Sequence, residues 1–175
     1  MTSNILSFGD KIPDIADSVF IAPSADVIGD VVIGDKSSIW FNCVVRGDVH
    51  FIKIGTRTNI QDGTVIHVSI GTHPTVIGDD VLVGHNCIIH GCTLESGSFV
   101  GMGTTVLDGA VVETGAMVAA GALLTPNKRV PSGELWGGSP ARYIRDLTEE
   151  QRNNLTSGAE HYAELAQVYK VSLEG

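Results

Sequence analysis

The chain has 175 residues, of which 43% are hydrophobic and 18% charged, and its formal net charge is −9. This composition is typical of one globular domain with a substantial core, and it excludes a disordered chain. The acidic balance argues against nucleic acid and anionic membrane surfaces as partners.

The opening stretch, MTSNILSFGDKIPD, lacks the basic and apolar regions of a signal peptide. No apolar run in the sequence is long enough to cross a bilayer. The three cysteines cannot all pair within one chain. Because unpaired cysteines are typical of reducing compartments, we expect a cytoplasmic protein.

Aliphatic residues recur every six positions through most of the chain, with irregular steps after residues 45, 66 and 89. A period of six fits neither a helix nor an alternating strand, and it is typical of a parallel β-helix of hexapeptide repeats. Three hexapeptides would make one triangular coil. The aliphatic residue points inward, as does a small residue four positions later, such as Cys43 or Thr93. The aliphatic series is Val27, Ile33, Ile39, Val45, Ile54, Ile60, Ile66, Ile77, Val83, Ile89, Leu94, Val100, Val106, Val112, Val118, Leu124 and Val130.

The six-residue repeat ends in the Gly- and Pro-containing stretch WGGSPARYIRD. Beyond it, Thr148 and Gln151 have the spacing of a capping box, and an amphipathic pattern follows. We therefore predict an all-β solenoid with a terminal helix. A parallel β-helix with a short N-terminal lead-in would cover residues 1–146, and an α-helix packed on it would cover residues 147–171.

The register of the repeats places the polar side chains on the prism. With its faces labelled A, B and C in chain order from Val45, the irregular steps all fall at the A-to-B corner. Residues that follow a face-A aliphatic by one position form an outward ladder of Arg46, His67 and His90. Residues that follow a face-C aliphatic by two positions form a second ladder of Asp62 and His85.

Three histidines can bind a catalytic metal and leave one coordination position open. His67 and His90 are expected to lie one strand spacing apart, so that they could share an ion. His85 lies at another corner of the triangle. A cyclic trimer with parallel axes would bring His85 of one subunit to the His67–His90 pair of the next.

Other interpretations of these residues stay open. An isolated outward histidine is more often a solvated surface residue than a ligand. Cys87 and Cys92 are rival ligands, although Cys87 occupies an inward position that favours core packing. His73 lies in the irregular loop at residues 69–75, where it is either a proton carrier or a loop residue without function.

At these residues the sequence resembles the gamma-class carbonic anhydrase family. The resemblance covers about residues 10–170 and rests on VVRGDV at 44–49, NIQDGTVIH at 59–67, GHNCIIHG at 84–91 and GGSPAR at 137–142. It implies a homotrimer of left-handed β-helices, each with a C-terminal helix, and metal sites at the subunit interfaces. The handedness is taken from this resemblance, since the period alone does not fix it.

The resemblance also implies roles for individual residues. The metal ligands would be His67, His85 and His90. A structural ion-pair cluster at the interface would contain Arg46, Asp48 and Asp62. Gln61 would orient the metal-bound water, with Asn59 in the same network and Tyr143 approaching from the tail. The expected cofactor is Zn²⁺, and Fe²⁺ or Co²⁺ would also suit imidazole ligands.

The implied reaction is the reversible hydration of carbon dioxide to bicarbonate by a metal-bound hydroxide. The sequence departs from active family members at two positions that carry glutamate there, which are Val49 and Ile70 here. It also lacks the long acidic loop that carries a proton shuttle in some members. The chain thus resembles the shorter, bacterial-type branch, and we expect its activity to be low, with His73 as the candidate proton carrier.

Three alternatives compete with this function. A hexapeptide acyltransferase would share the β-helix and use a single catalytic histidine. A metal-dependent thioesterase would use the same ligands on a thioester carbonyl. A catalytically weak subunit would keep the metal for assembly alone.

Overall fold

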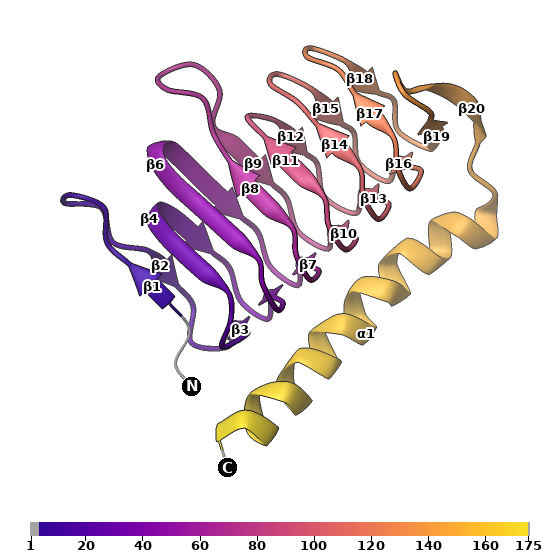
Figure 1. The fold of residues 1–175 in the computed structure, drawn as a ribbon. Helices are drawn as coiled ribbons and strands as arrows, with labels where there is room; N and C mark the ends of the chain where they lie inside the picture. Colours follow the sequence, from indigo (N-terminus) through magenta and orange to yellow (C-terminus); the bar gives the residue numbers. More distant parts are fainter. Residues whose placement is uncertain (1–3, 175) are drawn as a thin grey trace.

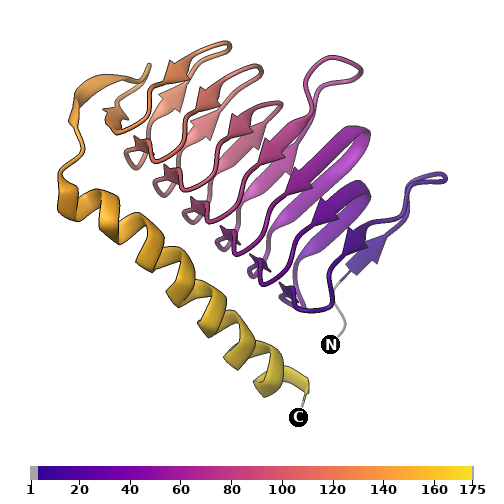
Figure 2. The same ribbon diagram turned by 180° about the vertical axis from the view of Figure 1, so that it is seen from behind.

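The computed structural model describes residues 4–174, which form a left-handed parallel β-helix with one long helix along a face (Figures 1 and 2). The chain rises coil by coil from the N-terminus, and the C-terminal helix runs back along the stack. This architecture confirms the predicted all-β solenoid with a terminal helix. Across residues 4–174, no helix has the length and apolar character needed to span a membrane.

Face C of the prism is an eight-stranded sheet that is parallel except for its last strand. The antiparallel strand β20 closes the final coil against β19. The strands of this sheet are β3 (Phe20–Ile21), β5 (Ser38–Ile39), β7 (Asn59–Ile60), β10 (Leu82–Val83), β13 (Phe99–Val100), β16 (Met117–Val118), β19 (Glu134–Gly137) and β20 (Arg142–Asp146).

Faces A and B belong to one twelve-stranded sheet, because the long strands β4 and β6 run across the corner between them. The first part of β6 pairs with β8 on face A, and its last part pairs with β9 on face B. The strands are β1 (Asn4–Leu6), β2 (Asp14–Ile15), β4 (Asp26–Ile33), β6 (Val44–Ile54), β8 (Val65–His67), β9 (Thr75–Ile77), β11 (Ile88–His90), β12 (Thr93–Leu94), β14 (Thr105–Val106), β15 (Val111–Val112), β17 (Leu123–Leu124) and β18 (Arg129–Val130).

The core is the column of inward aliphatic residues that the period of six predicts. Every member of the series from Val27 to Val130 is at most 3% exposed. The small corner residue is also buried in most coils, but Thr93 is an exception and is half-buried. The step from Ile89 to Leu94 is one residue short, so Cys92 takes the inward corner position instead. All three cysteines are free and buried.

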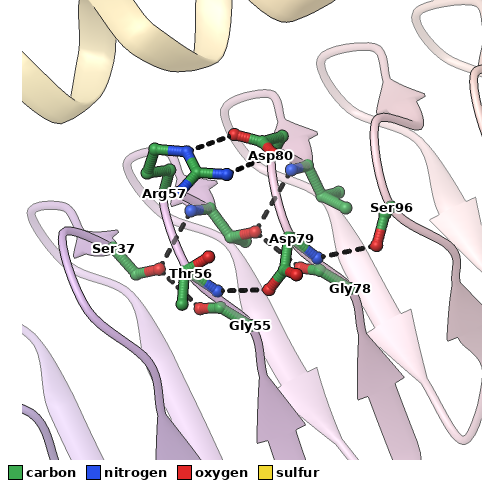
Figure 3. Close-up of polar contacts among 10 residues, drawn as sticks. Ser37, Gly55, Thr56, Arg57, Gly78, Asp79, Asp80 and Ser96 are labelled. Carbon is green, nitrogen blue, oxygen red and sulfur yellow. Dashed lines mark hydrogen bonds and ion pairs between the residues drawn. The ribbon is translucent and has the colours of Figure 1, made fainter.

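Polar ladders link successive coils at the corner between faces B and C (Figure 3). The backbone N–H of Thr56 donates to Asp79 Oδ1 over 2.7 Å, and the N–H of Asp79 donates to Ser96 Oγ over 3.1 Å. Arg57 makes a bidentate ion pair with Asp80, with both nitrogen–oxygen distances at 2.7 Å. Side chains here replace the backbone partners that the tight turns leave free.

Helix α1 (Glu149–Glu174) begins two residues after the predicted start and contacts β3, β5, β7 and β10 on face C. The capping box is present, because Thr148 Oγ1 accepts from Gln151 N–H and Gln151 Oε1 accepts from Thr148 N–H, each over 3.2 Å. Trp40 and Tyr169 pack edge to face at 5.0 Å beneath the last turns. The helix therefore covers the outer surface of the first coils of face C.

Candidate metal centre

His67 and His90 lie at the ends of two neighbouring strands on face A. Each histidine is the last residue of its strand, β8 or β11, and the parallel register sets one directly beside the other. Their ring centroids lie 5.1 Å apart, and His67 Nδ1 lies 3.1 Å from His90 Nε2. The structure thus brings these two sequence-predicted ligands together within one chain.

A carboxylate holds the outer nitrogen of each ring. His67 Nε2 lies 2.9 Å from Asp48 Oδ1, and His90 Nδ1 lies 2.6 Å from Asp108 Oδ1. Arg46 makes an ion pair with Asp48. Ser69 Oγ donates to Asp108 Oδ2 over 2.6 Å.

Both carboxyl groups are ionised at neutral pH. Burial alone would raise the pKa of Asp48, but hydrogen bonds from His67 and Arg46 outweigh it and lower that pKa. For Asp108, hydrogen bonds from Ser69 and His90 likewise outweigh burial and lower the pKa. An ionised carboxylate only accepts hydrogen bonds, so the outer nitrogen of each histidine is the one that carries the proton.

When both imidazoles are neutral, this assignment leaves two nitrogen lone pairs facing each other across 3.1 Å. A neutral imidazole has one N–H, which is already used on the carboxylate side of each ring. The facing lone pairs repel unless a cation lies between them. Two nitrogens on a tetrahedral zinc ion, each about 2.0–2.1 Å from the metal, lie about 3.3–3.4 Å apart. The spacing of the two rings therefore fits a shared metal ion.

The third predicted ligand lies on the second ladder. His85 follows β10 by two residues, its Nδ1 lies 2.9 Å from Asp62 Oδ2, and its side chain is 42% exposed. Its Nε2 is thus the nitrogen left for a metal. Within residues 4–174, no group of three or more His, Cys, Asp or Glu side chains from this chain gathers around one point. A complete three-histidine site would need His85 from another subunit.

The predicted ion-pair cluster is not assembled inside one chain. Arg46 pairs with Asp48 on the first ladder, whereas Asp62 pairs with His85 on the second. Gln61, almost fully buried, precedes Asp62 and lines a groove with His85. Whether Asp62 meets Arg46 across an interface stays a prediction.

Two further predicted residues lie away from the histidine pair. Asn59 is fully buried on β7, which α1 contacts, and its Nδ2 donates to Ser38 Oγ over 2.9 Å. Its Oδ1 has no hydrogen-bond partner among the described residues. Tyr143 is half-exposed on β20 in the last coil, where its hydroxyl donates to Asp146 Oδ1 over 3.1 Å. Their catalytic roles stay predictions.

Sequence reasoning missed Asp108, although the register contains the signal for it. Asp108 follows the face-A residue Val106 by two positions, one coil beyond His90, so its side chain points outward beside that histidine. His73 lies next to the same carboxylate, with its Nδ1 4.0 Å from Asp108 Oδ2. The acidic residues that lie two positions after a face-A aliphatic residue, and not only those that lie one position after it, include Asp108.

A family model, sequence relatives and a solved structure match this chain. The family model described as "Hexapeptide repeat of succinyl-transferase" matches residues 74–108. "Gamma carbonic anhydrase 1, mitochondrial" of Arabidopsis thaliana is 51% identical over 170 residues, which is 94% of this chain and 62% of that protein. The chain thus spans less than two thirds of the length of that relative.

Relatives of similar length match along almost their whole sequence. The "Probable carbonic anhydrase" of Methanocaldococcus jannaschii is 50% identical over 153 residues, covering 87% of this chain and 96% of that one. Among solved structures, a "hexapeptide transferase family protein" from Anaplasma phagocytophilum is 48% identical with a TM-score of 0.92. The match covers 97% of this chain and 99% of that one.

Proposed function

The chain belongs to the gamma carbonic anhydrase family, and we propose that it catalyses the reversible hydration of carbon dioxide to bicarbonate. The catalytic unit is a homotrimer in which neighbouring subunits share a divalent metal ion. The observation that carries this proposal is the approach of His67 Nδ1 and His90 Nε2 to 3.1 Å, with a carboxylate on the other nitrogen of each ring.

The three ligands divide between two corners of the prism. His67 and His90 supply two nitrogens from one subunit, and His85 supplies the third from the next. Each of the three rings has a carboxylate oxygen within 2.9 Å of one nitrogen, which leaves its other nitrogen for the metal. Zn²⁺, Fe²⁺ or Co²⁺ suits such a set of imidazole nitrogens, and we propose Zn²⁺ as the usual occupant.

When bound, a zinc ion lowers the pKa of a coordinated water to near 7 and so supplies hydroxide at neutral pH. Gln61 is 8% exposed, so its side chain has little room to move. A fixed amide of this kind can hold the attacking oxygen in line with carbon dioxide. Arg46 and Asp48 act through His67, because Asp48 bonds the outer nitrogen of that ring.

The proton must then leave without the glutamates of active family members. Val49 and Ile70 occupy those positions, both are exposed, and neither can carry a proton. His73 is 40% exposed in its side chain and lies beside the carboxylate that holds His90. We propose His73 as the proton carrier and expect slow turnover, since its nearest link to the site is a 4.0 Å contact.

Stopped-flow carbon dioxide hydration tests the proposal. Zinc-loaded and anaerobically iron-loaded wild-type protein would be compared with His85→Ala and with His161→Ala, a control on α1. We expect a rate above buffer that His85→Ala abolishes and His161→Ala leaves unchanged. Metal-replete protein without any rate would contradict the enzymatic function and favour a metal-binding assembly role.

One observation favours a second candidate, which is acyl or thioester chemistry. A groove beside His85 has mostly apolar walls, among them Phe99, Met102, Met117 and Tyr162. An acyl chain would suit such walls, and a solved relative carries the name hexapeptide transferase. Turnover of acetyl-CoA that persists after removal of the metal would support an acyltransferase, and turnover that needs the metal would support a thioesterase.

A further inference from the structure

A hydrogen-bonded network extends from His90 into the loop at residues 69–75. Its centre is Asp108, which lies in the turn after β14 and whose side chain is 31% exposed. One carboxylate oxygen bonds His90 Nδ1 over 2.6 Å, and the other accepts from Ser69 Oγ over 2.6 Å. Both oxygens are therefore engaged, one with the histidine and one with the loop.

We propose that Asp108 is a positioning residue that holds the His90 ring with Nδ1–H outward and Nε2 toward His67, and that ties the loop to the metal centre. Without this acceptor, the imidazole could place its single proton on either nitrogen. The tautomer with the proton on Nε2 has no lone pair facing His67. Asp108 thus selects the tautomer that can bind a metal. The inference rests on the proposed metal function for its consequence, but not for the tautomer itself.

The backbone leaves room for this network at Gly91. A Cβ at that position would lie 2.4 Å from Asp108 Oδ1 and 2.9 Å from His73 Cβ, closer than side chains approach. The φ angle of Gly91 is +55°, a conformation that side-chain-bearing residues adopt with strain. The step from Ile89 to Leu94 is one residue short, and Gly91 has no side chain. Together these two features let the Asp108 carboxylate reach the His90 ring.

The loop is held at both ends by groups of the site. Ser69 N–H donates to the carbonyl of His73 over 3.0 Å, which closes the loop. Thr75 Oγ1 donates to the carbonyl of His67 over 2.6 Å. Through Ser69 and Thr75, the loop therefore contacts the surroundings of both histidines, and the carboxylate that accepts from Ser69 also bonds His90.

The test compares Asp108→Ala, Asp108→Asn and Glu113→Ala in the full-length protein. Glu113 is a matched control, because it also accepts hydrogen bonds from the next coil, from Ser132 N–H and Arg129, but it lies away from the histidines. Zinc affinity is measured by competition with a chromophoric chelator. The protonated nitrogen of His90 is read in metal-free protein from long-range ¹H–¹⁵N NMR of histidine-labelled samples.

We expect Asp108→Ala to weaken zinc binding by about 10–100-fold, the usual effect of removing a carboxylate behind a histidine ligand. Asp108→Asn should recover most of the affinity, because its amide oxygen can still accept from Nδ1–H. Glu113→Ala should bind zinc as the wild type does. In metal-free protein, His90 should carry its proton on Nδ1 in the wild type and on a mixture of nitrogens in Asp108→Ala.

An Asp108→Ala variant that keeps both the wild-type affinity and the Nδ1–H tautomer would overturn the inference. Should wild-type protein bind no zinc, the metal function would fail, and the NMR measurement on metal-free protein would still decide the role of Asp108. Asp108→Leu, which keeps a similar side-chain size but has no acceptor, gives the same decision if the alanine variant does not fold.

Discussion

At the scale of single residues, the inward corner position follows a simple hydrogen-bond rule. Ser37 and Thr64 occupy it in two coils, and their hydroxyls donate to backbone carbonyls of the next coil, Gly55 and Gly84. Cys43 uses its thiol in the same way, with Sγ 3.1 Å from the carbonyl oxygen of Gln61. Serine, threonine and cysteine can thus each donate a side-chain hydrogen bond at this corner wherever a backbone carbonyl lies within reach.

Cys43→Ser and Cys92→Ser should therefore differ in stability although both thiols are buried. A serine at 43 can donate to the Gln61 carbonyl, whereas the Cys92 thiol donates to no carbonyl oxygen among the described residues. We expect Cys92→Ser to lower the free energy of unfolding by about 1–3 kcal/mol, the cost of a buried hydroxyl without an acceptor. Cys43→Ser should cost less than 1 kcal/mol, roughly a neutral exchange. Urea denaturation of both variants checks this, and equal losses would contradict the rule.

The ion pair of Asp48 predicts how the metal-free protein responds to acid. The pKa of Asp48 is lower in the folded protein than its usual value of 3.8, because His67 and Arg46 hydrogen bonds outweigh burial. A depressed folded pKa adds stability above the unfolded pKa, and this stability is lost as pH falls through the folded pKa. The melting temperature of the wild type should thus exceed that of Asp48→Asn at pH 7. The difference should shrink below about pH 4. A constant difference at every pH would contradict the electrostatic origin.

At the scale of elements, helix α1 depends on its N-terminal cap. Thr148 Oγ1 accepts the N–H of Gln151, and the helix has no basic residue in its last turn to balance its dipole. Thr148→Ala should cost about 1 kcal/mol of stability. Ser157→Ala, at an exposed position within the same helix, leaves the cap intact and is the matched control. A circular-dichroism melt that shifts equally in Thr148→Ala and Ser157→Ala would contradict the capping role.

The elements also show what the sequence can and cannot predict. The period of six located the inward column from Val27 to Val130, because each step of six returns the chain to the same position on the next face. It misplaced Thr93, since a five-residue step moves the inward corner to Cys92. Asp108 was missed for a related reason. His90 lies one position after a face-A aliphatic residue, whereas Asp108 lies two positions after one, so the two belong to different ladders. Comparing residues along a single ladder does not bring them together.

At the scale of the whole molecule, the predicted ligands lie at two separate places, and residues 4–174 of one chain contain no complete three-histidine site. The His67–His90 pair lies at the end of face A, and His85 lies beyond face C next to Asp62. The sequence could place both ladders, because register is a property of one chain. It could not show the distance between them in an assembly, because that depends on how subunits dock. In the proposed cyclic trimer, each pair would meet the His85 of the next subunit.

Mixed trimers test this sharing directly. A His67→Ala/His90→Ala subunit keeps His85, and a His85→Ala subunit keeps the pair, so neither can build a site in a homotrimer. When the two are co-expressed in equal amounts, an interface can hold a complete site only where the His67–His90 pair of a His85→Ala subunit faces the His85 of a His67→Ala/His90→Ala subunit. Random assembly makes about one interface in four complete in such a closed ring.

We therefore expect co-expressed protein to bind about a quarter of the wild-type zinc, while each parent binds almost none. Separately purified parents, mixed without unfolding, should stay empty until their subunits exchange. Metal content by mass spectrometry of the purified trimers measures the outcome, with His161→Ala in place of either parent as the control for co-expression. Zinc retained by either parent alone would mean that the mutated histidines are not required for binding, and co-expressed trimers without zinc would exclude sharing at the interface.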